Sequence, residues 1–226
     1  MKNKIITSYF VAAFLIGSLL KADAQKLEYG IRFMPTFSAF KIYTPTSGIV
    51  KGNVSFGYGV EHLFAYNFTK RFALQAEFLY SDLSLKYKEA DAERKIHLRY
   101  INIPILFSVN TNRYKTVNVN IVVGPQVGFL VESNIRTLNG DRTNNPNAVL
   151  LVKTGDLGLA YGAGIDFGLN KSRCLRLGLG FRGTYGLIDI SDHKVELAES
   201  YYLLNRTHVK TYSAYISLSF LFGKKG

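Results

Sequence analysis

Residues 157–168 have the sequence Leu-Gly-Leu-Ala-Tyr-Gly-Ala-Gly-Ile-Asp-Phe-Gly, in which apolar side chains recur at every second position. The positions between them are glycine or alanine, apart from Asp166. Alternation with a period of two is typical of a β-strand whose two faces meet different environments. Here one face is bulky and apolar, whereas the other is almost free of side chains.

The same alternation recurs along the whole chain and predicts an all-β fold. Phe and Tyr contribute 16 and 15 residues, Gly contributes 20, and Trp is absent, a composition that agrees with strands rather than helices. The predicted strands cover residues 27–37, 54–68, 72–80, 96–109, 117–131, 157–168, 175–187 and 211–222.

The connections between these strands alternate strictly in length. Short polar connections are expected at 69–71, 110–116 and 170–173, and long ones at 39–53, 82–95, 132–156 and 190–208. Transmembrane β-barrels have short periplasmic turns and longer outer loops. The alternation therefore places both chain ends, and all the short turns, on the periplasmic side.

A soluble barrel of the lipocalin type is the main structural alternative. Such barrels place large apolar side chains inside and polar ones outside. In this sequence the large residues share one face and the other face is glycine, alanine, serine and isolated charges, which cannot form a well-packed apolar core. The bulky face can instead meet lipid, while closure satisfies every backbone hydrogen bond. We therefore predict an eight-stranded antiparallel transmembrane β-barrel.

Prolines interrupt three of the predicted strands. Pro35, Pro104 and Pro125 each lack the backbone N–H that a ladder needs. We expect bulges or strand ends at these positions.

The N-terminus has the features of a secretory signal peptide. Lys2 and Lys4 precede an apolar stretch over 5–20, and Ala22-Asp23-Ala24 supplies small residues at the cleavage site. An uncleaved anchor is the alternative, although the stretch is shorter than the roughly 20 apolar residues of a spanning helix. We expect cleavage after Ala24, which leaves one barrel domain over 25–226 in the cell outer membrane.

Charged and amide side chains fall on the glycine-rich face, which is the expected lumen. Buried charges need partners, and eight strands enclose a bore only just wide enough for side chains. We therefore predict a polar network that plugs the lumen. Its predicted members are Arg32, Glu61, Gln75, Glu77, Gln126 and Arg182.

Basic residues without acidic neighbours occupy the short turns and the C-terminal tail, in a chain of net charge +12. This predicted basic rim consists of Lys70, Arg71, Arg113, Lys115, Lys171, Arg173, Lys224 and Lys225. Contact with anionic lipid headgroups is one explanation, and docking of an acidic periplasmic or envelope protein is the other. Export makes nucleic acid an implausible partner.

Candidate catalytic groups are sparse. His62 is expected on the lipid face, His97 near an outer strand end, and Asp192-His193 and His208 in the last long loop. No serine-hydrolase motif, metal-ligand spacing or phosphate-binding loop accompanies them. We expect no catalytic residue, no metal and no cofactor.

Three stretches resemble a known family. They are Arg-Tyr-Ile-Asn-Ile-Pro-Ile-Leu at 99–106, Val-Gly-Pro-Gln-Val-Gly-Phe at 123–129 and Gly-Leu-Ala-Tyr-Gly-Ala-Gly-Ile-Asp at 158–166. Their order and spacing are similar to those of the PorT-like outer-membrane β-barrel family of Bacteroidetes. The resemblance implies the barrel fold, and PorT itself takes part in type IX secretion.

Three functional hypotheses follow. The first is a non-enzymatic barrel with a structural or interaction role and a plugged lumen. The second is an accessory component of a type IX secretion or other envelope complex, which rests on analogy at the level of the fold. The third, ranked last, is a lipid A-modifying outer-membrane enzyme.

Overall fold

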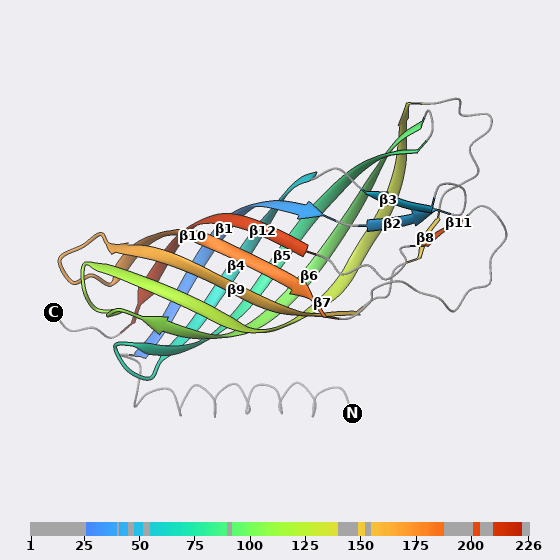
Figure 1. The fold of residues 1–226 in the computed structure, drawn as a ribbon. Helices are drawn as coiled ribbons and strands as arrows, with labels where there is room; N and C mark the ends of the chain where they lie inside the picture. Colours follow the sequence, from blue (N-terminus) through green and yellow to red (C-terminus); the bar gives the residue numbers. More distant parts are fainter. Residues whose placement is uncertain are drawn as a thin grey trace, which may run out of the picture.

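A computed structural model describes residues 26–39, 41–44, 48–51, 55–89, 92–139, 149–151, 155–187, 201–203 and 210–222. Eight of its strands form a closed barrel in the order β1-β12-β10-β9-β7-β6-β5-β4 (Figure 1). They are β1 (Leu27–Ala39), β4 (Ser55–Asn67), β5 (Phe72–Glu89), β6 (Ala92–Asn110), β7 (Val117–Asn139), β9 (Gly155–Gly168), β10 (Leu175–Gly186) and β12 (Lys210–Leu221). Every neighbouring pair is antiparallel, and β1 closes the barrel by pairing with both β4 and β12. The predicted fold class is confirmed.

Four short strands lie outside the barrel, within three of the predicted long loops. They are β2 (Lys41–Thr44), β3 (Gly48–Lys51), β8 (Val149–Leu151) and β11 (Tyr201–Leu203). β2 pairs antiparallel with β3, and β8 pairs parallel with β11. No helix in the described part of the chain is long and apolar enough to span a membrane.

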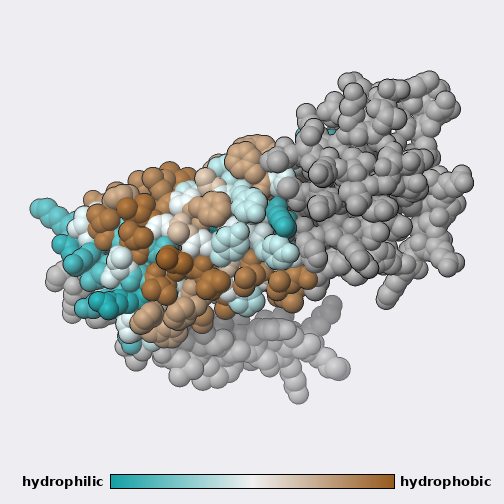
Figure 2. Space-filling view, in the orientation of Figure 1, coloured by the Kyte–Doolittle hydropathy of each residue, from teal (hydrophilic) through white to brown (hydrophobic). Residues whose placement is uncertain are grey.

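The outward face of the barrel is apolar and the inward face is polar, the reverse of a soluble barrel. Phe56 and Ile121 are 62% and 61% exposed, whereas Glu61 on the inward face is fully buried. Figure 2 shows apolar residues over the visible face of the barrel, next to a hydrophilic end formed by the short turns. This apolar outward surface, which we call the apolar belt, is bordered by a hydrophilic end and matches the lipid-facing surface of a transmembrane barrel.

The three strands β5, β6 and β7 continue beyond the others, so the predicted loop at 82–95 is wrong. β5 and β6 stay paired until Glu89 faces Ala92, and β6 pairs with β7 as far as Asn139. Figure 1 shows this extension rising past the rest of the barrel. The lipid-face pattern of β5 ends at Tyr80, because the next apolar residues, Leu83 and Leu85, stand at positions of the opposite face.

The expectation of bulges or strand ends at the prolines is also wrong. The pairing of β1 with β4 runs through Pro35, and that of β7 with β9 runs through Pro125, without a change of register. The register shifts of β6 against β7 lie elsewhere, at Glu93/Arg94 and Arg99/Tyr100. A proline has no backbone N–H to donate to one of its two adjacent strands. The strand therefore loses residue pairs with that strand and stays paired with the other.

Gly124 allows β6 and β7 to approach closely between Pro104 and Pro125. A Cβ at Gly124 would stand 2.0 Å from the carbonyl oxygen of Ile105, which is backbone and cannot move aside cheaply. We expect Gly124→Ala to lower the free energy of unfolding by about 1–3 kcal/mol, the usual cost of overpacking. Urea unfolding in detergent measures this. Gly155→Ala is the matched control, because no atom of the described residues lies within 4 Å of its Cβ position. Equal stability of the two variants would contradict the close approach.

Candidate functional site: charge clusters in the barrel lumen

The middle of the lumen contains a compact cluster of two arginines and two glutamates. Nη1 of Arg32 donates to Glu61 at 2.5 Å and to Glu77 at 3.2 Å. Arg182 donates to both oxygens of Glu77, at 2.8 and 3.0 Å. All four side chains are buried, and their formal charges cancel. We call these four residues the central cluster.

Strand register explains why these side chains meet. Arg32 on β1 is paired with Glu61 on β4. Glu77 on β5 is paired with Leu63, which lies two residues after Glu61 on the same strand. Arg182 approaches from β10, on the other side of a narrow bore, and donates to Glu77. Because lumen-facing side chains alternate along every strand, the sequence pattern places all four on one face.

The aromatic ring of Tyr215 packs against the central cluster. Cζ of Arg32 lies 4.3 Å from the ring centroid, in cation–π geometry. The ring occupies space left by two glycines: a Cβ on Gly180 would stand 2.4 Å from Cζ of Tyr215, and one on Gly164 would stand 2.0 Å from its Oη. The glycine-rich lumen face therefore makes room for a large side chain from the neighbouring strand.

The two remaining predicted members do not join the central cluster. Nε2 of Gln126 donates to Asn102 at 3.2 Å, and Asn102 in turn donates to Ser81. Gln75 lines a cavity, and its buried Oε1 has no hydrogen-bond partner among the described residues. The structure thus brings together four of the six predicted residues and places the amides elsewhere in the lumen.

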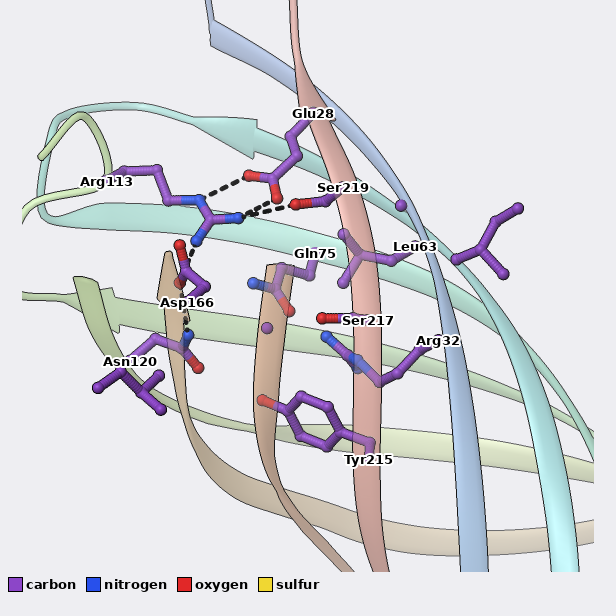
Figure 3. A pocket seen from close by; sticks show the side chains of 14 residues that line it. Glu28, Arg32, Leu63, Gln75, Arg113, Asn120, Asp166, Tyr215, Ser217 and Ser219 are labelled. Carbon is purple, nitrogen blue, oxygen red and sulfur yellow. Dashed lines mark hydrogen bonds and ion pairs between the residues drawn. The ribbon is translucent and has the colours of Figure 1, made fainter. Parts of the chain in front are cut away.

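A second charge cluster lies in the lumen at the short-turn end, where Arg113 departs from its predicted place on the basic rim. Its guanidinium points inward, with Nε donating to Glu28 at 2.7 Å and the other nitrogens contacting Glu28 and Asp166 (Figure 3). Burial by itself lowers the pKa of Arg113, but the carboxylates of Glu28 and Asp166 raise it overall. The turn 111–116 folds over the mouth because these carboxylates need a cation.

Asp166 is the centre of this second cluster. It accepts hydrogen bonds from Asn118 at 2.9 Å and Asn120 at 3.3 Å, and its carboxylate also contacts Arg176 and Arg113. Arg176 is completely buried and donates further to the carbonyl of Lys115 at 2.9 Å. We call Glu28, Arg113, Asp166 and Arg176 the mouth cluster, and its formal charges also cancel.

Comparison with known proteins agrees with this architecture. The model of a family described as the outer membrane protein beta-barrel domain matches residues 23–192. The chain belongs to this family. No curated protein matches the sequence.

Solved structures of outer-membrane proteins resemble this family member in fold. OprG from Pseudomonas aeruginosa is 14% identical with a TM-score of 0.54, covering 87% of this chain and 96% of that one. Ail from Yersinia pestis, solved with the heparin analogue sucrose octasulfate, is 16% identical with a TM-score of 0.42, covering 86% and 99%. Neisserial surface protein A is 10% identical with a TM-score of 0.43, covering 86% and 97%. The family match and the likeness to OprG place the chain among outer-membrane β-barrels.

Two small cavities flank the central cluster of this outer-membrane barrel. One lies toward the mouth, between Arg32 and Arg113, and the other lies on the far side, beside Tyr100 and Arg182. Each has a volume of about 30 Å³, and a water molecule needs about 10–15 Å³. Each cavity therefore has room for a few waters.

The rest of the predicted basic rim faces outward where it is described. The side chains of Lys70, Arg71, Lys115, Lys171 and Arg173 are exposed. Lys224 and Lys225 lie outside the described residues. We call the five described side chains the exposed rim cations.

The candidate catalytic histidines do not assemble a site in the described part of this barrel. His62 lies on the lipid face, where its Nδ1 is 2.9 Å from the hydroxyl of Tyr29. His97 lies 3.8 Å from Asp82 near the outer extension. His193 and His208 lie outside the described residues. Among the described residues, no group of three or more His, Cys, Asp or Glu side chains could hold a metal ion.

Proposed function

We propose that this outer-membrane barrel is non-enzymatic, that its lumen is closed, and that it acts through its outer surfaces. The two charge clusters carry the proposal, because they block the bore at two heights. Eight strands enclose little more than side-chain volume, and here that volume is filled by paired guanidinium and carboxylate groups. Export by a signal peptide cleaved after Ala24 is part of this proposal.

The outer extension of β5, β6 and β7 supports an interaction role. It prolongs three strands beyond the apolar belt, in the direction opposite to the mouth cluster. A sheet that leaves the membrane in this way can carry contacts with molecules outside the cell. Because the bore is closed, we place the function of the barrel on these outer surfaces.

The expected electrical result is that the wild-type barrel passes no sustained current in a planar bilayer. Arg32→Ala and Arg113→Ala should each remain closed, because the other cluster still blocks the bore. The double variant Arg32→Ala/Arg113→Ala should conduct. Single-channel recording checks all four proteins, and large wild-type currents would show that the lumen is an open pore.

An accessory role in a type IX secretion or other envelope complex is the second candidate. The exposed rim cations favour it, since a positive surface attracts an acidic protein. A changed profile of secreted proteins after gene deletion would support this candidate over the first. A lipid A-modifying activity ranks third, and lipid A mass spectrometry with and without the gene decides it.

A further inference from the structure

The three short turns are joined by hydrogen bonds into one surface. The backbone N–H groups of Arg113 and Asn110 donate to the carbonyls of Lys70 at 2.8 Å and Arg71 at 2.6 Å. On the other side, the N–H of Gly168 at the end of β9 donates to Thr116 at 2.7 Å, and Nη1 of Arg173 in the third turn donates to the carbonyl of Tyr114 at 3.4 Å. These bonds and the mouth cluster hold the turns in fixed positions. The exposed rim cations therefore project from a rigid base.

No described carboxylate offsets these cations at the surface of this end. The two acidic residues here, Glu28 and Asp166, are buried and paired with Arg113 and Arg176. Because the side chain of Arg113 points inward, it pairs with Glu28 and Asp166. The described charged side chains that remain exposed on the rim are therefore all cations. Such a surface attracts anions.

The distance of these cations from the apolar belt indicates which kind of anion they can meet. Phe68 and Phe72, which belong to the apolar belt, lie on either side of the three-residue turn that contains Lys70 and Arg71, and Leu169 stands two residues before Lys171. A turn this short extends at most about 7 Å past the belt, given about 3.3 Å per extended residue. The headgroup layer on each side of a bilayer is about 5–8 Å thick. The backbone of the turn consequently lies within that layer, from which the exposed Lys and Arg side chains can reach the lipid phosphates.

We propose that the exposed rim cations form a binding surface for anionic phospholipid headgroups, so that the barrel enriches such lipids around its short-turn end. A protein partner would have to enter the headgroup layer to reach the same side chains, whereas lipid phosphates already occupy it. This inference concerns the rim and does not depend on a closed lumen.

Because the chain contains no Trp, a single introduced Trp reports on the neighbouring lipid. Phe68→Trp places the probe beside the cations, and Phe37→Trp places it at the opposite end of the belt; the two phenylalanines are 47% and 48% exposed. Each protein is reconstituted in vesicles of phosphatidylcholine and phosphatidylglycerol, with bromine on one lipid at a time. Quenching of the Trp fluorescence gives the relative occupancy of the two lipids.

We expect phosphatidylglycerol to be preferred about fivefold at Phe68→Trp, the order produced by a single well-placed basic side chain at an anionic surface. At Phe37→Trp, where Lys210 lies on the paired strand, any preference should stay unchanged when the exposed rim cations are neutralised. The preference at Phe68→Trp should disappear when Lys70→Gln, Arg71→Gln, Lys115→Gln and Lys171→Gln are added, and it should weaken in high salt. Equal quenching by both lipids at Phe68→Trp would overturn the proposal, as would a preference that survives neutralisation.

A second measurement distinguishes lipid from an acidic protein. A labelled polyglutamate peptide is added to the barrel in nanodiscs of phosphatidylcholine alone, and its fluorescence anisotropy is followed. Our proposal expects no binding, since the cations reach lipid phosphates within the headgroup layer. Binding that the four Lys/Arg→Gln substitutions abolish would overturn the proposal in favour of an acidic protein partner.

Discussion

Glu77→Gln should lower the free energy of unfolding of the barrel by about 3–5 kcal/mol, the usual cost of removing one partner from a buried ion pair. Glu77 accepts hydrogen bonds from both Arg32 and Arg182. The amide keeps the shape of the side chain but removes its charge, so two buried guanidinium groups would share the single carboxylate of Glu61. Unfolding in urea, followed by the heat-dependent mobility of the folded barrel on gels, measures the loss.

The double variant Glu77→Leu/Arg182→Met is the control for this prediction. It removes one acid and one base together and leaves Arg32 paired with Glu61. Replacement of a whole buried pair by apolar residues is often close to neutral, so the double variant should recover most of the stability that Glu77→Gln loses. If the double variant is as unstable as Glu77→Gln, charge balance is not what stabilises the central cluster.

Asp166→Asn should have an effect of similar size at the mouth. The carboxylate of Asp166 contacts Arg113, Arg176 and Asn118. With its charge removed, Arg176 would be buried without a carboxylate partner among the described residues, and Arg113 would keep Glu28. We again expect a loss of about 3–5 kcal/mol in the free energy of unfolding, measured in urea.

Asn120→Ala is the matched control at the mouth, because its 3.3 Å hydrogen bond to Asp166 is a peripheral contact. We expect it to cost about 0.5–1.5 kcal/mol, the net contribution of one ordinary hydrogen bond. A loss as large as that of Asp166→Asn would mean that the amide, rather than the charge, stabilises the mouth.

The barrel and its central cluster could be predicted because both depend on a simple alternation. Arg32, Glu61, Glu77 and Arg182 stand on the glycine-rich face of their strands, and a narrow bore forces charges on that face to meet. The strand extensions could not be predicted in the same way. Beyond Tyr80 the apolar residues Leu83 and Leu85 stand on the face opposite to Leu74 and Phe78, so the lipid-face pattern ends before the strand does.

The mouth cluster was missed because Arg113 lies in a turn, and a basic turn residue is ordinarily solvated. A signal was nevertheless present in the sequence. Glu28 and Asp166 both fall on the lumen face at the short-turn end, where Arg176 is the single lumen-facing cation supplied by a strand. Two buried acids and one base leave an excess negative charge, and the nearest turn contains the second base.

The mouth cluster also bears on the order in which the barrel can be completed. Arg113 and Glu28 are 85 residues apart in sequence, and their partner residues come from β9, β10 and β12. The Arg176–Asp166 contact joins the neighbouring strands β9 and β10, but the contacts of Arg113 with Glu28, Asp166 and Ser219 cannot form within an isolated hairpin. Closure of the barrel, in which β12 pairs with β1, therefore brings together the strands that share this cluster. Its stabilisation resists the separation of the first strand from the last, rather than the fraying of any single turn.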